Sequence, residues 1–298
     1  MNYSEIENIC NKYECTCLRN FELAAKTSIR IGGECDIYTE PNSEECLTDI
    51  LDVCRRNSLP YFILGNGSNL LIKRFNGAVI ATGSLPDNYS AEGNRITVGA
   101  GVPLSHVCLC ALERSLSGME CLYGIPGSVG GALYMNAGAY GGEMKDIVKS
   151  ARCVNERGEI VEITAEEMKL RYRGSIFSEN GWCILSVTME LIPDDKLTIK
   201  SRMDAFMQKR RAKQPLEYPS CGSTFKRPAG YFAAALIEEC GLKGCTVGGA
   251  QVSEKHSGFV INRGGASFED VMELVEHIKR TVREKKGIEL ECEMLILE

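Results

Sequence analysis

Two glycine-rich stretches hold the residues whose types and spacing could do chemistry. The first, Gly65-Asn66-Gly67-Ser68-Asn69, directly follows a short apolar run. Because glycine adopts backbone conformations closed to other residues, such a loop can point successive N–H groups at one phosphate. It lacks the third glycine and the following helix of a Rossmann dinucleotide-binding loop. A tight turn between two strands is the alternative interpretation.

The second stretch begins at Gly124 and reads GIPGSVGGALYMNAGAYGG. This density of glycine permits close approach of a bulky ligand to the backbone. A pyrophosphate with attached rings, held between the two stretches, would explain both, whereas consecutive turns without a ligand are the alternative. The candidate ligand-binding residues of this stretch are Gly124, Gly127, Ser128, Gly130, Gly131 and Asn136.

The overall charge restricts the partners of the chain. Its 34 Lys and Arg against 40 Asp and Glu give a net charge of -6. Sequence-independent binding to nucleic acid needs a surplus of basic residues, so we exclude that class of function. An anionic small molecule is compatible with this charge only if its site supplies local positive charge.

The chain has fifteen cysteines, and its first residues lack the basic start and apolar core of a signal peptide. We therefore expect reduced thiols and a cytoplasmic protein. Cys46 and Cys54 lie in helix-like apolar runs, where cysteine packs as a small hydrophobic residue. Cys10, Cys15 and Cys17 have no matching zinc-ligand cluster downstream, so no metal site is predicted and their role stays open. No apolar run approaches the roughly 20 residues that cross a bilayer, which predicts no membrane insertion.

Strands and helices that could position the glycine stretches alternate along the first third of the chain. The pattern predicts strands at 34–38, 61–64, 70–72 and 96–98, and helices at 44–57 and 104–117. A hairpin with strands at 151–154 and 160–163 and a strand at 182–191 follow, and residues 193–195 read as a linker.

The last third predicts two helices and a terminal strand. The helices are expected at 198–213, stopped by Pro215, and from Ser267 to Gly287, with Asp270 completing a capping box. Residues 288–297 alternate between apolar and acidic side chains, which is typical of a strand with one buried face. Glu289, Glu291 and Glu293 share the other face of that strand.

The order of several segments resembles the MurB family of UDP-N-acetylenolpyruvoylglucosamine reductases. Together the matching pieces span nearly the whole chain: KTSIRIGG from Lys26, LGNGSNLLI from Leu64, the glycine stretch from Gly124, RYRGSIF from Arg171, PSCGSTFKRP from Pro219, AGYFAAALIEECGLKG from Ala229, GGAQVSEKHSGFVIN from Gly248 and LECEMLIL from Leu290. The short spacing between RYRGSIF and PSCGSTF resembles the shorter, second type within that family.

The resemblance implies an α+β fold. A two-subdomain FAD-binding domain of the vanillyl-alcohol-oxidase (PCMH) type would cover residues 1–195, with subdomains at about 1–82 and 83–195. A C-terminal α+β substrate domain would cover 196–298. It also implies non-covalent FAD, bound by Arg30 and the residues of both glycine stretches, NADPH as co-substrate, and a monomer.

The implied reaction converts UDP-N-acetylglucosamine enolpyruvate to UDP-N-acetylmuramate in peptidoglycan synthesis. Hydride from flavin N5 goes to one carbon of the double bond and a proton goes to its neighbour. By resemblance, Arg173 polarises the enolpyruvyl carboxylate, Ser223 donates the proton and Glu293 stabilises the enolic intermediate. The implied substrate-binding residues are Tyr172, Lys226, Arg227, Lys255 and His256.

Simpler interpretations exist for the three catalytic candidates. Arg173 could be a surface arginine, Ser223 a turn serine and Glu293 a solvated carboxylate. The chain departs from the family at Leu295, where arginine is common. Two rival functions remain: a flavin-dependent alcohol or sugar oxidase of the same superfamily, and a non-catalytic flavin or UDP-sugar binding protein.

Overall fold

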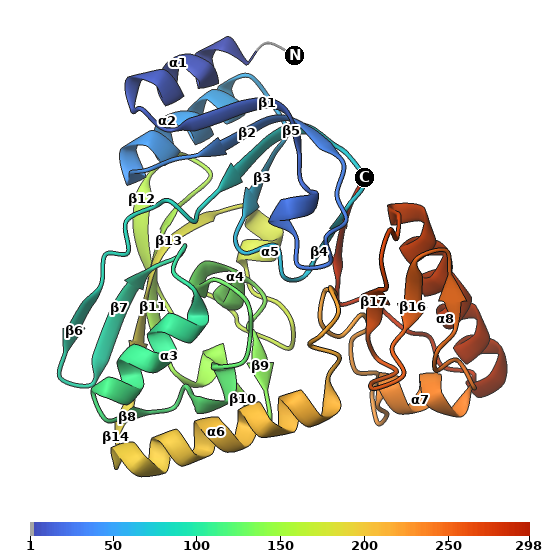
Figure 1. Ribbon diagram of the computed structural model, residues 1–298. Helices are drawn as coiled ribbons and strands as arrows, with labels where there is room; N and C mark the ends of the chain where they lie inside the picture. The colour runs from blue at the N-terminus through green and yellow to red at the C-terminus, as the bar shows by residue number, and fades with distance from the viewer. Residues whose placement is uncertain (1–2) are drawn as a thin grey trace. The chain divides into compact units, whose positions relative to one another are not determined.

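The computed structural model describes residues 3–298, which form two compact units (Figure 1). The first unit contains the residues up to Phe21, Cys35–Asn66 and Asn76–Gln208, and the second contains Glu22–Glu34, Gly67–Phe75 and Lys209–Glu298. The chain passes between the units several times, so neither unit is a continuous stretch of sequence. The predicted boundary after residue 195 separates an FAD-binding domain from a substrate domain, and it stays a prediction.

One layer of the first unit is a four-stranded sheet with two helices on one face (Figure 1). In sheet order its strands are β1 (Thr16–Glu22), β2 (Glu34–Glu40), β5 (Phe75–Ala81) and β3 (Tyr61–Leu64). The helices are α1 (Ser4–Lys12) and α2 (Glu44–Arg56). Apolar residues spaced along α2 bury Ile50 against Ile37 and Ile80 of the sheet. The predicted strands at 34–38 and 61–64 and the predicted helix at 44–57 are confirmed.

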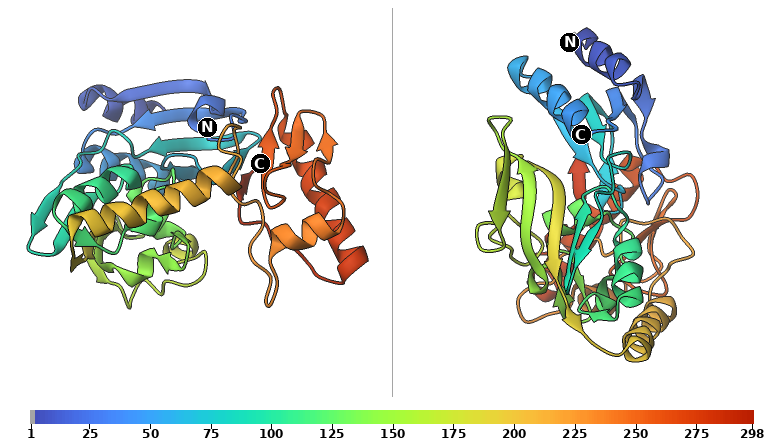
Figure 2. Two further views of the ribbon diagram at one scale, coloured as in Figure 1. Left: turned by 60° about the horizontal axis from the view of Figure 1, so that its bottom comes forward. Right: turned by 90° about the vertical axis from the view of Figure 1, so that its left-hand side faces the viewer.

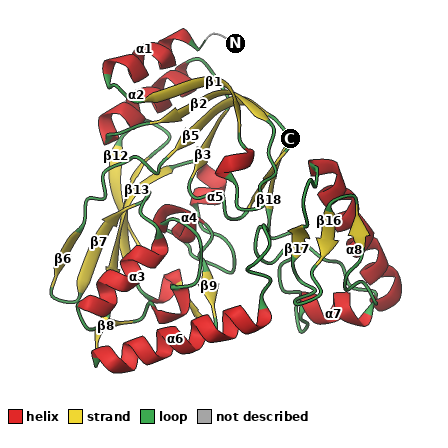
Figure 3. Cartoon of the chain, viewed as in Figure 1, coloured by secondary structure: helices red, strands yellow, loops and turns green. Residues whose placement is uncertain are grey.

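The other layer of the first unit is a five-stranded antiparallel sheet (Figure 3). In sheet order its strands are β12 (Ile160–Thr164), β11 (Val148–Val154), β13 (Cys183–Glu190), β7 (Arg95–Gly99) and β6 (Ser90–Glu92). Ala151 of β11 lies opposite Ile163 of β12, which confirms the predicted hairpin. Apolar residues of α3 (Leu104–Glu113) and α4 (Val129–Tyr134) share one buried cluster with this sheet.

The prediction of a helix over 104–117 is wrong at its C-terminal end. Helix α3 stops at Glu113, and Ser115 has a φ of 58°, which an α-helix does not tolerate. The next residues form β8 (Leu116–Ser117), which pairs with β14 (Ile192–Pro193). The glycine stretch contains α4, which the sequence reading missed. The remaining short elements of this unit are η2 (Glu120–Leu122), β9 (Gly138–Ala139), β10 (Gly142–Glu143), η3 (Met144–Asp146) and α5 (Phe177–Asn180).

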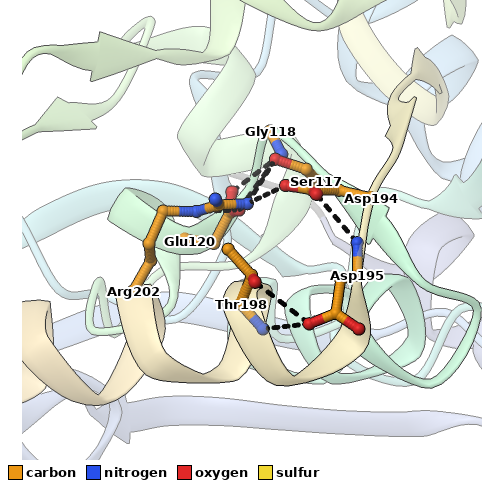
Figure 4. A network of polar contacts seen from close by, with 7 residues as sticks. All are labelled: Ser117, Gly118, Glu120, Asp194, Asp195, Thr198 and Arg202. Atoms are coloured by element: carbon orange, nitrogen blue, oxygen red, sulfur yellow. Dashed lines mark hydrogen bonds and ion pairs between the residues drawn. The ribbon is translucent and has the colours of Figure 1, made fainter.

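The long helix α6 (Lys196–Lys213) confirms the prediction at 198–213, and Figure 2 shows it as one straight rod. Its first turns are fastened by polar contacts within the first unit (Figure 4). Arg202 donates to Glu120 at 2.8 Å, and Asp195 accepts from the N–H of Thr198 at 2.8 Å. Burial alone would raise the pKa of Glu120, but N–H groups of Glu120 and Gly118, with Arg202, lower it overall. The ionised carboxylate therefore anchors the helix.

The second unit contains a three-stranded sheet covered by helices (Figure 3). Its strands are β15 (Thr246–Val247), β16 (Ala250–Val252) and β17 (Val260–Asn262), and its helices are η1 (Ala24–Lys26), α7 (Ala233–Glu239) and α8 (Phe268–Lys286). Ser267 and Asp270 form the predicted capping box of α8, and Gly287 ends the helix with a φ of 69°. Within residues 3–298, no helix is both long and apolar enough to cross a bilayer.

The prediction of a continuous strand over 288–297 is wrong. Only β18 (Leu295–Leu297) is a strand, and it pairs in parallel with β4 (Leu70–Ile72). The residues that precede β18 do not continue this pairing with β4, because Cys292 forms an isolated antiparallel bridge with Phe225. Leu290 and Met294 are buried as the alternation indicated, but side-chain alternation does not reveal that the backbone changes its bonding partner.

Candidate functional site

The first two residues of the first glycine stretch, Gly65 and Asn66, lie beside the second stretch in the first unit. The side-chain amide of Asn66 donates to the carbonyl of Pro126 at 3.2 Å. The α-carbon of Gly65 is so close to Ser128 that an added Cβ would lie 2.5 Å from the serine Oγ. Two stretches about sixty residues apart in sequence are thus in contact, as the binding of one ligand by both would require.

These glycines also serve a purpose that the sequence did not indicate. A Cβ on Gly130 would lie 2.8 Å from that of Ala100, and one on Gly131 would lie 3.3 Å from Ser128 Oγ. Ser128 caps α4 by accepting from the N–H of Gly131 at 3.2 Å. Gly127 accepts from the N–H of Leu104, and Gly124 lies in the loop between η2 and α4. Several of these glycines are therefore required for packing of the protein on itself.

Backbone donors nevertheless remain available at the first stretch. In the described part of the chain, the N–H groups of Gly65 and Asn66 donate to no protein acceptor. Asn66 is exposed, so these donors are open to an anion.

The remainder of the first stretch belongs to the second unit. Gly67 has a φ of 58°, and a Cβ there would lie 2.0 Å from the carbonyl oxygen of Lys26. Only glycine fits this position. Asn69 donates from its amide to the carbonyl of Glu293 at 2.9 Å, and Ser68 beside it is half-buried. Asn69 therefore holds the backbone of a predicted catalytic residue.

Arg30 also lies in the second unit, with a φ of 57°. Its exposed side chain borders a surface groove that Lys73 and the start of α8 also line. Lys73 is paired with Glu269 across 2.9 Å. The groove therefore has one arginine whose guanidinium bonds to no acceptor among residues 3–298.

Asn136, predicted to bind a ligand, has its side chain committed to protein contacts. Its amide nitrogen donates to Glu143 at 2.8 Å and to the carbonyl of Arg171 at 3.0 Å, and its oxygen accepts from the N–H of Lys145 at 2.9 Å. The residue is fully buried. Asn136 therefore acts by positioning the loop that carries Arg173.

Arg173 lies in a tight turn that closes between Arg171 and Gly174 by backbone bonds of 3.0 and 3.1 Å. Its φ of 53° is a left-handed conformation that costs a non-glycine residue about 1–3 kcal/mol. The guanidinium donates to the carbonyl of Gly138 at 3.2 Å and stacks over the exposed ring of Tyr172. Ser175 anchors the turn by donating to the carbonyl of Tyr134 at 2.8 Å.

Ser223 and Glu293 come from adjacent backbone segments of the second unit. Thr224 links them, because its carbonyl accepts from the N–H of Glu293 at 2.9 Å. The same threonine is buried, donates from its N–H to Gly258 at 2.8 Å and accepts from the N–H of Val260 at 3.0 Å. Ser223 is half-buried, and its hydroxyl bonds to no other residue in the part that the structure describes. That hydroxyl is open to a ligand.

The basic residues predicted to bind substrate lie in the second unit, whereas Tyr172 lies in the first. Lys226 pairs with Glu291, and Lys255 pairs with Glu217 across 3.4 Å. Arg227 is exposed and lies 3.9 Å from the ring centre of Phe232. Two of the predicted cations are thus already partly neutralised, which reduces the local positive charge they offer to an anion.

His256 is largely buried and packs edge-on against Phe259. Burial lowers its pKa, so the ring is neutral at pH 7. Its Nδ1 accepts from the N–H of Gly258 at 3.2 Å, which leaves the hydrogen on Nε2 as a donor. The contact of His256 with substrate stays a prediction.

The structure thus gathers the predicted residues into two groups. The first unit holds Gly65, Asn66, Gly124, Gly127, Ser128, Gly130, Gly131, Asn136, Tyr172 and Arg173, and the second holds the others. The sequence reading missed Thr224 and Ser175 as positioning residues. Nothing in their local pattern distinguishes them, since each acts through a backbone group distant in sequence.

Comparisons with known proteins agree along the chain. Residues 35–164 match an FAD binding domain, and residues 214–297 match the C-terminal domain of UDP-N-acetylenolpyruvoylglucosamine reductase. The reductase of that name from Clostridium novyi is 48% identical over 295 residues, covering 98% of this chain and 95% of the relative. The one from Caldanaerobacter subterraneus is 46% identical over 280 residues, covering 93% and 92%.

A solved structure extends the agreement to the fold. The crystal structure of UDP-N-acetylenolpyruvylglucosamine reductase from Thermus caldophilus superposes with a TM-score of 0.80 at 33% identity, covering 95% of this chain and 99% of that one. The predicted fold class and the predicted resemblance are confirmed. The chain is an oxidoreductase with an FAD-binding domain. It belongs to the UDP-N-acetylenolpyruvoylglucosamine reductase family.

Proposed function

We propose that this protein uses NADPH to reduce UDP-N-acetylglucosamine enolpyruvate to UDP-N-acetylmuramate, a step of peptidoglycan synthesis. The observation that carries the proposal is the 48% identity to a named reductase over 98% of the chain. The proposal includes action as a monomer in the cytoplasm.

The first unit offers features that suit FAD. The unbonded N–H groups of Gly65 and Asn66 are the type of donor that binds a pyrophosphate, and the second glycine stretch packs directly beside them. We assign these two residues to the phosphates. When bound, FAD supplies the hydride from its N5 atom.

Each catalytic residue has a role that its surroundings support. The guanidinium of Arg173 is always charged and can polarise the enolpyruvyl carboxylate, and its turn is fixed by Asn136 and Ser175. Ser223 delivers the proton, since its hydroxyl has no competing protein acceptor. Glu293, held through its backbone by Thr224 and Asn69, stabilises the enolic intermediate.

Substrate binding follows from the same residues. We assign Tyr172, Lys226, Arg227, Lys255 and His256 to the UDP-sugar. Because Glu291 and Glu217 already engage two of these cations, the substrate phosphates must displace or share those carboxylates. His256 offers one neutral donor, Nε2–H.

An anaerobic spectroscopic experiment tests the proposal. Purified protein is mixed with NADPH, and the flavin absorbance is expected to bleach. The enolpyruvyl UDP-sugar is then added without oxygen, and the absorbance should return as the double bond is reduced. Titration with NADH in place of NADPH measures the preference between the two reductants.

The same experiment separates the rival functions. A flavin oxidase would regain its colour with oxygen and not with the enolpyruvyl UDP-sugar. A non-catalytic binding protein would show no bleaching with NADPH. Either result would refute the proposed reaction.

A further inference from the structure

Four cysteines gather at one place in the first unit. Cys10 lies on α1, Cys15 immediately precedes β1, Cys17 lies on β1 and Cys46 lies in the first turn of α2. The sulfur atoms of Cys15 and Cys46 are 3.5 Å apart. Cys10 and Cys17 lie near enough for each thiol to shift the pKa of the other, and Cys15 also affects the pKa of Cys10. We call these four residues the thiol cluster.

Local geometry explains why the cluster forms. The chain turns back after α1, where the N–H of Cys15 donates to the carbonyl of Cys10 at 2.9 Å. Cys15 and Cys17 are two residues apart in extended backbone, so their side chains point to the same side. That side faces the apolar cluster shared by α1 and α2, to which Cys10 and Cys46 belong. All four thiols therefore meet between two helices and an edge strand.

Metal binding does not account for the thiol cluster. Among residues 3–298, no three His, Cys, Asp or Glu side chains are arranged to hold a metal ion. All fifteen cysteines are free thiols, so the cluster contains no disulfide. The chemistry that remains for sulfur atoms this close is oxidation.

Each contacting pair joins one accessible thiol to one buried thiol. Cys15 and Cys17 are partly exposed, whereas Cys10 and Cys46 are fully buried. The interaction with Cys10 lowers the pKa of Cys17, and the interaction with Cys17 raises that of Cys10. Burial raises the pKa of Cys46 to about 12, with a contribution from its bond with Cys15. An oxidant thus meets the exposed sulfur first, and the buried sulfur is already in place to react with the product.

We propose that the thiol cluster is an oxidation site at which a hydroperoxide forms two disulfides, Cys15–Cys46 and Cys10–Cys17. In each pair the exposed thiolate attacks the peroxide O–O bond and becomes a sulfenic acid. The buried sulfur then attacks that sulfenic sulfur, forming the S–S bond and releasing water. With hydrogen peroxide, two thiols lose two electrons and two protons, and two water molecules are produced.

The two disulfides would join three elements of the first layer. Cys10–Cys17 ties α1 to β1, and Cys15–Cys46 ties the start of β1 to α2. Cross-links of this kind stabilise a protein mainly by restricting its unfolded chain. The oxidised protein is therefore expected to unfold at a higher temperature than the reduced protein, and dithiothreitol should reverse the change.

Mass spectrometry of the whole protein tests the proposal. Reduced protein is treated with hydrogen peroxide, remaining thiols are alkylated, and the protein is digested without reductant. Because only Thr16 separates Cys15 from Cys17, both stay on one peptide, and the expected product is that peptide linked to the peptides of both Cys10 and Cys46. Cys15→Ser should retain only the Cys10–Cys17 link, and Cys17→Ser only the other. Cys245→Ser, at another partly exposed cysteine, should retain both.

Thermal unfolding provides an independent readout. Oxidation should raise the unfolding midpoint of the wild type by roughly 5–10 °C, and should leave that of the Cys15→Ser, Cys17→Ser double variant unchanged. The midpoints of the reduced proteins show whether the serines themselves disturb folding. The proposal is wrong if the four thiols remain alkylatable under peroxide, if Cys15 and Cys17 end as separate sulfinic acids, or if the links join other cysteines.

Discussion

The loop that carries Arg173 and the segment that carries Ser223 are built in opposite ways. The Arg173 turn is fixed by side chains, since Asn136 donates to the carbonyl of Arg171 and Ser175 donates to that of Tyr134, and its backbone is strained at Arg173. The Ser223 segment is fixed by backbone bonds of Thr224, and the serine hydroxyl itself bonds to nothing in the described chain.

The difference corresponds to what each side chain is proposed to do. A permanently charged guanidinium needs no change of protonation, so its loop can be fixed before substrate arrives. A hydroxyl that donates a proton to substrate must not be engaged by another acceptor. The protein therefore fixes the neighbouring residue Thr224 and leaves the Ser223 hydroxyl without a protein partner. The variants below test this contrast, in decreasing order of expected effect.

Ser223→Ala should have the largest effect. We expect the reoxidation of reduced flavin by the enolpyruvyl substrate to slow by about 10²–10⁴-fold, because the proton donor is lost. Bleaching by NADPH should keep its normal rate, and stopped-flow absorbance measures both steps. Ser220→Ala, whose hydroxyl only contacts a nearby N–H at 3.4 Å, is the matched control. Normal reoxidation in the Ser223 variant would remove the assigned role.

Arg173→Lys should have an intermediate effect. Lysine keeps the charge but loses the planar fork, and a hydrogen bond to a charged group is worth about 1.5–3 kcal/mol, or roughly 10–100-fold in rate. The slowing should affect reoxidation and not bleaching. Arg171→Lys, where the native arginine pairs with exposed Glu179, should be nearly normal. Equal effects of the two variants would show that Arg173 has no special role.

Asn136→Ala tests whether the Arg173 turn depends on its side-chain anchors. Truncation orphans the buried groups that the amide now satisfies, which costs about 1–3 kcal/mol in the free energy of unfolding. Urea denaturation measures that loss, and reoxidation should also slow. Asn94→Ala removes a single bond to Leu191 and should cost less. If flavin reoxidation stays normal, the turn does not need this anchor.

The pH dependence of stability should show the smallest effect. The pKa of His256 is lowered by burial, so its contribution to stability is fully present above its ordinary value of about 6.5 and is lost as pH falls through the folded value. The slope from this group cannot exceed about 1.4 kcal/mol per pH unit. His256→Gln should flatten the acid side of the stability curve, measured by urea denaturation at several pH values. An unchanged curve would show that His256 titrates alike in both states.

Local sequence patterns predicted much of the secondary structure. Helix α8 followed from Ser267, Asp270 and Gly287, because capping chemistry acts within a few residues. The β11–β12 hairpin followed from alternating residues about a short turn. These predictions succeeded because the interactions that decide them are local.

The errors lie where distant segments decide the structure. Residues 288–294 alternate like a strand, yet their backbone bonds to the segment of Phe225, which no local pattern reveals. The glycines at 130 and 131 pack against Ala100 and Ser128, a contact that the glycine pattern does not reveal, and their binding of a ligand stays a prediction. Cys10, Cys15 and Cys17 gave no sign of their fourth partner, Cys46.

The amino-acid sequence by itself determined the family, the fold class and the residues proposed for chemistry. It could do so because the motifs and their order along the chain are visible in the sequence. Tertiary structure alone decided which groups have partners: Asn136 is saturated, Ser223 is unbonded, and four thiols share one place. The physical reason is that hydrogen bonding and burial depend on atoms that only folding brings together. Residues far apart in the sequence carry no local pattern that identifies them as partners.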